Sequence, residues 1–162
     1  MSGDSLAIEL ESVAERADLI PTIARWYWIE WGQAAGRSLE SETARLMGRA
    51  NRDRIPMTWL ALEKDQPVGS VMLVQHDMPD QSDLANLAPW LAGLYVLPTH
   101  RGLGVGGTLT CRCEAEARRL GNSRLFLYTW TARALYKRLG WTDYSEREHR
   151  GRLVTIMSKS LG

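Results

Sequence analysis

Cysteine and histidine are scarce in this chain of 162 residues, which has two of the first and three of the second. Cys111 and Cys113 are two positions apart in a segment with a helical pattern, so their side chains point to nearly opposite faces. They can neither pair with each other nor bind one metal ion together. His76, His100 and His149 are scattered and lack the spacing of metal ligands. The sequence therefore predicts no metal site.

The chain also lacks a strong net charge and long apolar runs. Its formal net charge is +1 and its basic residues are spread along the chain, which argues against nucleic acid as a partner. No apolar run approaches the roughly 18 residues of a membrane span. The N-terminus, Met1 to Asp4, has no basic segment before an apolar one, so no signal peptide is expected. We therefore expect a cytoplasmic protein that binds neither nucleic acid nor membrane.

Hydrophobic periodicity and turn residues divide the chain into strands and helices. Strands are predicted at 7–10, 57–63, 67–75, 90–96, 124–128 and 153–158, and helices at 18–31, 41–52, 104–120 and 131–139. The length fits one domain, which we place at residues 1–162. The order of elements indicates an α/β fold with a sheet of mixed direction. Strand 90–96 is almost wholly apolar, which is typical of a central buried strand.

A glycine-rich segment follows that strand and begins a helix. Residues 98–108 read Pro-Thr-His-Arg-Gly-Leu-Gly-Val-Gly-Gly-Thr. Glycines let backbone N–H groups face outward with no Cβ in the way. The helix N-terminus adds unpaired donors and a partial positive charge, and Arg101 adds a fixed charge at the rim. The sequence therefore predicts a loop that binds pyrophosphate.

Two common pyrophosphate loops fit this segment poorly. Gly102, Gly104 and Gly107 match the dinucleotide pattern G-x-G-x-x-G, but no acidic residue ends the next strand, 124–128, where the ribose needs one. A P-loop needs a lysine directly after its glycines, and none is present. A nicotinamide-dependent oxidoreductase is therefore the less favoured alternative.

Two motifs at a family's usual separation give the loop a closer match. Arg101, Gly104 and Gly106 fill the pattern Arg or Gln, two residues, Gly, one residue, Gly or Ala. Residues 132–141, Ala-Arg-Ala-Leu-Tyr-Lys-Arg-Leu-Gly-Trp, resemble a second motif, A-x-x-L-Y-x-x-x-G-F, with Trp141 in place of Phe. Both are motifs of the GNAT superfamily of N-acetyltransferases, which the chain resembles over about residues 90–141.

The resemblance implies a fold, an activity and a cofactor site. The fold would be the single-domain GNAT acyl-CoA N-acyltransferase fold, with a mixed, mostly antiparallel sheet and flanking helices. The activity would be direct transfer of the acetyl group of acetyl-CoA, the cosubstrate, to a primary amine. The strand ending at Val96 would splay from strand 124–128, leaving backbone N–H groups for the pantetheine and the thioester. The implied cofactor-binding residues are Leu94, Tyr95, Val96, Arg101, Gly102, Leu103, Gly104, Val105, Gly106, Gly107, Thr108, Thr129 and Ala132. Thr129 stands where the family commonly has Asn.

Tyr136 of the second motif is the candidate catalytic residue. A phenol is protonated at neutral pH and can donate a proton to the departing CoA thiolate. The candidates for the acceptor site are Trp28, Glu30, Trp31, His76 and Asp77, and Trp26 and Trp90 are further aromatic candidates for its wall. His76, Asp77 and Glu30 remain alternatives for the general base.

The acceptor and the partners stay open at this point. A small-molecule amine and a peptide amine both fit, and a homodimer is left open. The alternative from another class is a non-catalytic domain of the same fold, which would sense acyl-CoA or bind a partner. Such a domain would keep the glycine loop but would not need Tyr136.

Overall fold

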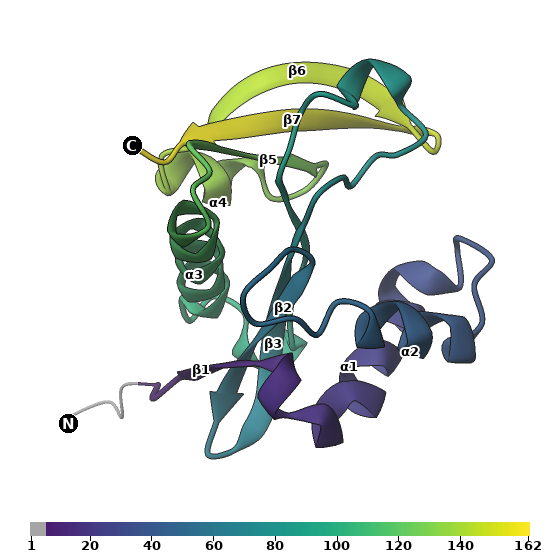
Figure 1. Cartoon of the computed structure of the whole chain (residues 1–162), viewed down its shortest axis with the longest axis vertical. Helices are drawn as coiled ribbons and strands as arrows, with labels where there is room; N and C mark the ends of the chain where they lie inside the picture. The colour runs from purple at the N-terminus through teal and green to yellow at the C-terminus, as the bar shows by residue number, and fades with distance from the viewer. Residues whose placement is uncertain (1–5) are drawn as a thin grey trace.

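A seven-stranded sheet organises the chain, and the computed structural model describes residues 6–162 of it (Figure 1). In sheet order the strands are β1 (Glu9–Ser12), β2 (Met57–Glu63), β3 (Gln66–Val74), β4 (Trp90–Val96), β5 (Arg124–Thr129), β7 (Arg152–Ser160) and β6 (Thr142–His149). The helices are α1 (Ile20–Tyr27), α2 (Leu39–Met47), α3 (Val105–Arg119) and α4 (Arg133–Arg138). Neighbouring strands are antiparallel except β4 and β5, which are parallel. The predicted mixed, mostly antiparallel sheet with flanking helices is confirmed.

Two expectations, on a signal peptide and on a membrane span, depend on which residues the structure describes. Residues 1–5, on which the expectation about a signal peptide rests, lie outside the described residues. Within residues 6–162, no helix combines the length and the apolar character that crossing a membrane requires.

The β2–β3 hairpin follows from its sequence. Glu63 pairs with Gln66, so the turn consists of Lys64 and Asp65. Both residues have positive φ, 48° and 66°, which matches the right-handed twist of the flanking strands in a two-residue turn. The predicted strand 57–63 is confirmed, and its partner begins at Gln66, one residue before the predicted start.

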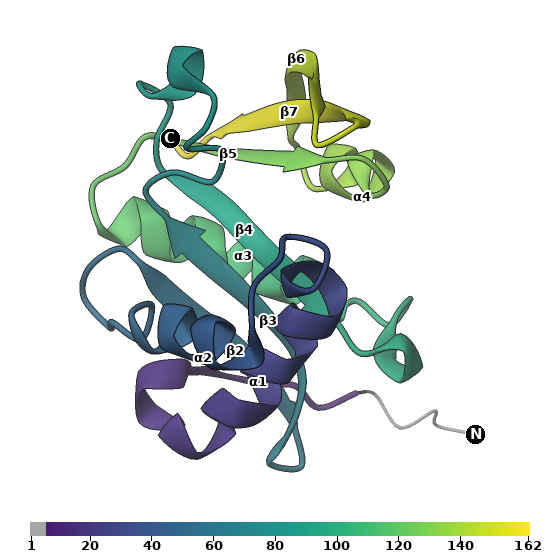
Figure 2. The same cartoon turned by 90° about the vertical axis from the view of Figure 1, so that its right-hand side faces the viewer.

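Helices cover both faces of the sheet and give it two cores. Ile23 of α1 and Leu46 of α2 pack in the first core, and Leu109 of α3 packs in the second. All three side chains are almost completely buried. Figure 2 shows α1 and α2 on one side of β2, β3 and β4, with α3 on the other. A ligand that reaches both faces must therefore pass between strands.

The middle of β4 carries a bulge. Ser70 pairs with Tyr95, and Met72 pairs with Ala92. One residue of β3 lies between Ser70 and Met72, whereas two residues of β4 lie between Ala92 and Tyr95. Gly93 lies in this bulge with φ +59°, and a side chain there would collide with Cε of Met72. Glycine is therefore required at this position for two independent reasons.

Past the bulge, β4 leaves its neighbour β5. The two strands pair only at Trp90 and Phe126, near their N-terminal ends. Figure 2 shows β4 and β5 running apart from that point. Leu94 and Val96 pack in the core on the α3 side, and Tyr95 packs on the α1 side. The predicted splay is confirmed, and we call the separation of β4 from β5 beyond Trp90 and Phe126 the gap.

β6 is a strand that the sequence analysis did not predict. Its sequence, Thr-Asp-Tyr-Ser-Glu-Arg-Glu-His, has no apolar alternation, and most of its residues are exposed. The strand lies at the sheet edge and pairs only with β7. An edge strand with little burial leaves no hydrophobic pattern to detect.

Several predicted boundaries were displaced. The first strand was predicted at 7–10 and lies at Glu9–Ser12, and helix 41–52 is α2 at Leu39–Met47. Ser38 begins α2, because its Oγ accepts a hydrogen bond of 3.0 Å from the Ser41 N–H. The helix predicted at 18–31 changes to a π-helical turn at Trp28–Gly32.

Candidate active site

The glycine loop presents an open helix N-terminus. Gly104 directly precedes α3 with φ +87°, and Gly102 has φ +76°. At either position a Cβ would have no described heavy atom within 4 Å beyond its chain neighbours. The backbone N–H groups of the first turn of α3 therefore stay accessible to an anion. This is the geometry that the predicted pyrophosphate loop requires.

The other residues of the loop differ in exposure. The side chain of Leu103 is exposed, whereas Val105 is buried in the core on the α3 side. Val105 therefore offers no side chain to a ligand. The hydroxyl of Thr108 donates a hydrogen bond of 3.0 Å to the Gly104 carbonyl oxygen, which holds the first turn of α3 in place.

Arg101 folds back onto β4. Its Nε donates to the Val96 carbonyl oxygen at 3.0 Å, and its Cζ lies 5.8 Å from the centre of the Tyr95 ring. These contacts place a guanidinium between the glycine loop and the end of β4. The predicted positive charge at the rim of the loop is therefore fixed in position, because the Arg101 guanidinium bonds to the main chain of β4.

Three elements meet beside the gap between β4 and β5. A Cβ at Gly106 would lie 3.8 Å from Leu135 of α4 and 3.9 Å from both Leu94 and Val96 of β4. The first turn of α3 thus faces an apolar wall formed by α4 and β4.

Thr129 and Ala132 fix the start of α4. The Thr129 Oγ1 accepts a hydrogen bond of 3.0 Å from the Ala132 N–H. Thr129 is buried at the end of β5. These two predicted cofactor residues lie at the far side of the gap, and the contact that the structure gives them orients α4.

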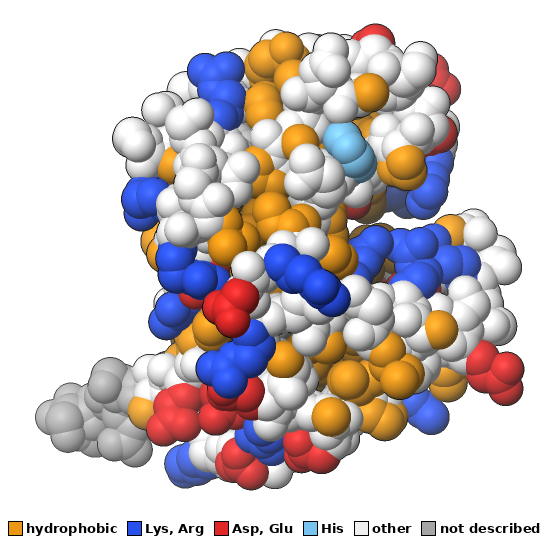
Figure 3. All heavy atoms as spheres, in the orientation of Figure 1, with side chains coloured by type: hydrophobic (Ala, Val, Ile, Leu, Met, Phe, Trp, Pro, Cys, Tyr) orange, Lys and Arg blue, Asp and Glu red, His pale blue; other side chains and the backbone are white. Residues whose placement is uncertain are grey.

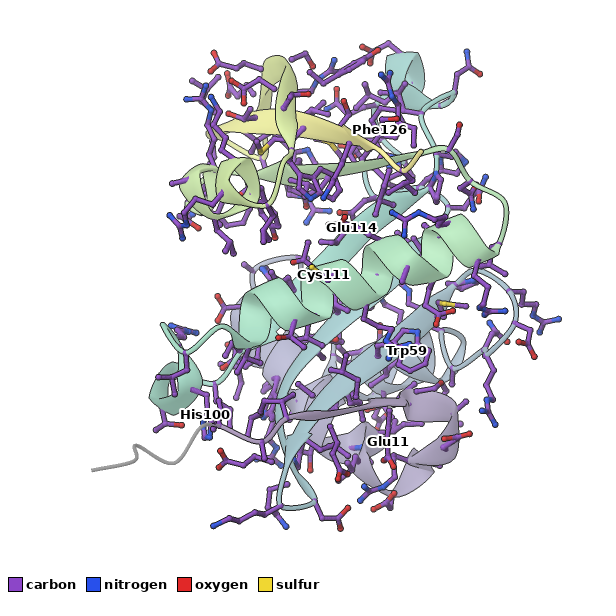
Figure 4. The ribbon with its side chains drawn as sticks, turned by 90° about the vertical axis from the view of Figure 1, so that its left-hand side faces the viewer. Glu11, Trp59, His100, Cys111, Glu114 and Phe126 are labelled. Atoms are coloured by element: carbon purple, nitrogen blue, oxygen red, sulfur yellow. The ribbon has the colours of Figure 1, made fainter. Side chains whose placement is uncertain are left out.

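An open groove of about 700 Å³ begins at the glycine loop and follows the outer face of α3. It is lined by Leu10, Gly104, Gly107, Thr108, Cys111, Arg112, Ala115 and Leu139. Figure 4 looks onto this face, with Cys111 and Glu114 labelled on the helix. Cys111 is exposed and Cys113 is buried, so the predicted opposite orientation of the two thiols is confirmed.

Tyr136 lies buried on α4, on the α3 side of the sheet. Its ring packs edge-on against Trp141 with 5.9 Å between ring centres. Burial raises the pKa of Tyr136 above its ordinary value, and the neighbouring Cys113 adds to the effect. The sulfur of Cys113 in turn lies 3.7 Å from the Met72 carbonyl oxygen in the middle of the sheet. The phenol is therefore protonated at neutral pH and lies next to the thiol that faces the sheet centre.

Aromatic side chains line the other face of the gap. Tyr95 packs against Trp26, with 5.3 Å between ring centres, and against Trp31, with 6.4 Å. Two predicted acceptor-site candidates, Trp28 and Glu30, lie near the π-helical segment. The Trp28 Nε1 donates to the Arg37 carbonyl oxygen at 2.8 Å and so closes the turn after the π-helical segment. Glu30 is exposed on that turn.

Trp90 and His76 are not part of this aromatic wall. Trp90 is buried in the core, where its Nε1 donates to the Leu87 carbonyl oxygen at 2.6 Å. His76 is exposed and lines a separate cavity of about 130 Å³ together with Met78 and Leu84. The structure therefore brings Trp31 close to β4 and leaves His76 in a different cavity.

Asp77 is the predicted acceptor residue with the most unusual environment. Its side chain is partly buried, and desolvation raises its pKa to about 7 although Arg49, Arg150 and Arg45 oppose the shift. Asp77 also raises the pKa of Tyr128, which burial alone already elevates, to about 12. A carboxylate that titrates near neutrality can accept a proton and return it.

Figure 3 shows how basic side chains are distributed on one face of the molecule. A notch opens on the right-hand side between α2 and the end of the β6–β7 hairpin, and Lys and Arg side chains gather on both of its walls. The sequence analysis missed Arg45 and Arg49. Their spacing of four positions within the predicted helix 41–52 was the only available signal, because it places both side chains on one face.

The comparison with known families decides how these features are interpreted. The model of the acetyltransferase (GNAT) family matches residues 20–141, a range that includes β4, the glycine loop and Tyr136. The chain belongs to this family. It is therefore an acyltransferase by family, and acetyl-CoA is the cosubstrate of that family, as predicted. No curated protein matches the chain.

Solved structures of this family share the fold at low sequence identity. An aminoglycoside 6′-N-acetyltransferase complexed with coenzyme A is 14% identical, with a TM-score of 0.74 over 94% of this chain and 97% of that one. A GNAT acetyltransferase from Streptococcus pneumoniae is 18% identical, with a TM-score of 0.70 over 96% and 100%. A protein from Salmonella typhimurium solved with its cofactor acetyl-CoA is 18% identical, with a TM-score of 0.68 over 96% and 95%. The likeness confirms the predicted fold and leaves the acceptor open.

Proposed function

We propose that this protein transfers the acetyl group of acetyl-CoA directly to a primary amine. One observation supports the proposal: β4 and β5 separate, and the two faces of the sheet beside the gap carry different functional groups. The glycine loop and Tyr136 lie on the α3 face, and the aromatic wall lies on the α1 face with Asp77 nearby. A thioester and an amine could meet in this gap from opposite sides.

The cofactor would extend from the glycine loop into the gap. Its pyrophosphate would bind the free N–H groups at the start of α3, beside Arg101. The residues assigned to the cofactor are Leu94, Tyr95, Val96, Arg101, Gly102, Leu103, Gly104, Val105, Gly106, Gly107, Thr108, Thr129 and Ala132. Main-chain groups of β4 that have no partner on β5 would hold the pantetheine and polarise the thioester. An N–H directed at the developing oxyanion contributes about 3 kcal/mol.

The transfer needs one acid and one base. The neutral amine nitrogen attacks the thioester carbon, and the C–S bond of the tetrahedral intermediate then breaks. Tyr136 would donate its proton to the departing thiolate, and Asp77 would take up the proton that the amine loses, directly or through water. Burial supports both roles, because it keeps the phenol protonated and brings the pKa of the carboxyl group to about 7.

The acceptor is a small-molecule or peptide amine in this proposal. We assign the whole activity to residues 1–162 as one domain, since both faces of the gap are built from this chain. The exposed His76 and Glu30 are not needed for the chemistry.

The test is turnover of acetyl-CoA with a panel of amines. The panel should include amino acids, a polyamine, an aminoglycoside and short peptides, with free thiol and acetylated product both measured. We expect stoichiometric thiol and acetylated amine with at least one acceptor. Tight binding of acetyl-CoA without any product would instead identify a non-catalytic acyl-CoA sensor of the same fold.

A further inference from the structure

Arginines outnumber carboxylates around the acceptor face of the gap. The group comprises Arg37, Arg45, Arg49 and Arg150. Their positive charges lower the pKa of a neighbouring arginine or oppose the rise in the pKa of Asp77 and Tyr128. The acidic residues among them are Glu42, Asp77 and the exposed Asp80. Four guanidinium groups therefore face three carboxyl groups, which leaves the local charge positive.

Glu42 neutralises one side of this arginine group. It is buried, and its Oε2 accepts a hydrogen bond of 2.7 Å from the Arg37 Nε. Its other oxygen lies 3.9 Å from the Arg45 Nε. Arg45 still has a lowered pKa, because desolvation and the nearby guanidiniums of Arg49 and Arg37 all disfavour its charge. Glu42 therefore does not satisfy the whole group.

Arg49 is the partly buried member of the group without a carboxylate partner, and the exposed Arg150 also has none among the described residues. Among residues 6–162, no Asp or Glu oxygen lies within 4.0 Å of its guanidinium. Its Nη1 instead contacts the Met72 sulfur at 3.2 Å, and a thioether is a weak acceptor. The side chain is only partly exposed, so water does not fully replace the missing partner.

The position of Arg49 is fixed beside the bulge of β4. Its carbonyl oxygen accepts a hydrogen bond of 3.0 Å from the hydroxyl of Thr58, a fully buried residue of β2. Met72, which the guanidinium touches, packs directly against Gly93 in the bulge of β4. Arg49 thus lies one side chain away from the point where β4 turns towards the gap.

We infer that the amine acceptor also carries an oxyanion, most simply a carboxylate, which binds Arg49 with support from Arg45. This inference rests on the proposed function and names its substrate class. The acceptor would bind as an amino acid does, with its anionic group on the arginines and its amine near Asp77. A planar guanidinium matches a carboxylate or phosphonate with two parallel hydrogen bonds. A polycationic acceptor such as an aminoglycoside would be repelled by the same charges.

The experiment compares acceptors that differ only in charge. The catalytic efficiency kcat/KM is measured for a set of α-amino acids, for their carboxamides and for aminoalkylphosphonates. We expect the wild type to prefer the anionic acceptors by about tenfold or more, the usual weight of a hydrogen bond to a charged group. Carboxylate and phosphonate are distinguished by which of the two anionic series is the better substrate.

Two variants assign the preference to Arg49. Arg49→Met should bring the ratio of amino acid to amide close to one, mainly through KM, while Arg49→Lys should retain part of it. Arg54→Met is the matched control, because Arg54 is exposed on the same loop and its Nε bonds only to Asn51 at 3.2 Å. It should keep the wild-type ratio.

The possible failures are distinct. If amines are acetylated but amides or polyamines react as well as the anionic acceptors, the inference is wrong and the proposed function stands. If Arg49→Met and Arg49→Lys both bind acetyl-CoA and keep the full preference, Arg49 is not the anion site. If no amine is acetylated at all, the proposed function fails first.

Discussion

Burial raises the pKa of both Tyr136 and Asp77, and the consequence differs because their ordinary values differ. The phenol starts at 10.0, so a higher value keeps it protonated throughout the physiological range. The carboxyl group starts at 3.8 and reaches about 7, so it changes its charge near neutral pH. One physical cause, desolvation, thus suits one residue to donate a proton and the other to exchange one.

Tyr136→Phe tests the acid role. The substitution removes one oxygen and preserves the ring that packs against Trp141, so the fold should survive. An interaction that forms only as charge builds on sulfur lowers kcat and kcat/KM together. We expect kcat to fall about 10²-fold, with acetyl-CoA affinity within about threefold of the wild type by calorimetry. Turnover at the wild-type rate would make Tyr136 a core aromatic only.

Asp77→Asn tests the base through the pH dependence. The group that faces Asp77 consists of Arg45 and Arg49 beside the sheet, Arg150 at the β6–β7 turn, and Tyr128 on β5. The arginines and Tyr128 do not change charge near neutral pH, and burial lowers the pKa of His149, which packs against Tyr128. A rise in kcat/KM through pH 7 that the variant lacks would therefore belong to Asp77. We expect the variant to lose this rise and to keep only the limb that titrates the acceptor amine. An unchanged profile would exclude Asp77 as the base.

The same variant should change stability with a definite sign. The pKa of Asp77 is higher in the folded state than its ordinary value of 3.8, so folding favours the protonated form. That contribution is fully present below pH 4 and is lost as the pH rises to about 7. Relative to the wild type, Asp77→Asn should therefore become more stable as pH increases over this range. Urea unfolding at pH 4 and pH 8 measures the difference.

At the scale of elements, α3 is bounded by two glycines in the same conformation. Gly104 precedes the helix with φ +87°, and Gly121 follows it with φ +88°. A Cβ at either one would meet no described heavy atom within 4 Å beyond its chain neighbours. Replacing either by valine therefore costs about 1–3 kcal/mol of backbone strain and little else in the free protein. The two positions differ in the proposed site, because the pyrophosphate of the cofactor would approach Gly104 and not Gly121.

Gly104→Val and Gly121→Val form a matched pair. Both should lower the free energy of unfolding by a similar amount, whereas only Gly104→Val should lose acetyl-CoA affinity, because its side chain blocks the approach of the pyrophosphate. Calorimetric titration under conditions where both variants are folded measures the difference. Equal affinity in the two variants would place the cofactor away from the glycine loop.

At the scale of the whole molecule, the gap between β4 and β5 separates the sheet into two parts. Contacts across the molecule hold them together. Glu114 of α3 accepts a hydrogen bond of 3.3 Å from Trp141 and forms an ion pair of 2.7 Å with Lys159 of β7. Figure 1 shows β5, β6, β7 and α4 on one side and the remaining strands on the other, with α3 spanning towards both. A cofactor in the gap would contact both parts and stabilise their association.

Acetyl-CoA should therefore raise the melting temperature. At a ligand concentration of 100 times Kd, binding to the folded state alone adds about 2.7 kcal/mol. For a domain of this length that corresponds to a shift of about 5–10 °C. NADH, which also carries a pyrophosphate but requires an acidic residue for its ribose, should give no comparable shift. A larger shift with NADH would revive the oxidoreductase alternative.

The sequence by itself determined the family, the central strands and the glycine loop. Each depends on local requirements: β2 and β4 on apolar runs, the hairpin turn on Lys64 and Asp65, and the loop on glycines that tolerate positive φ. These features are encoded by neighbours in the chain, so residues 57–63 and 90–96 were predicted with the observed bounds. The motif around Tyr136 was recognisable for the same reason.

Only the tertiary structure decided the acceptor side. Asp77, Arg49 and Tyr128 are far apart in the sequence, and their shared environment arises where the loop after β3, the end of α2 and β5 come together. Exposed strand β6 also escaped prediction, because an edge strand needs no apolar face. Desolvation and the balance of charges are sums over neighbours in space. A single sequence does not give those neighbours, and so the proposal for the acceptor could be argued only from the folded chain.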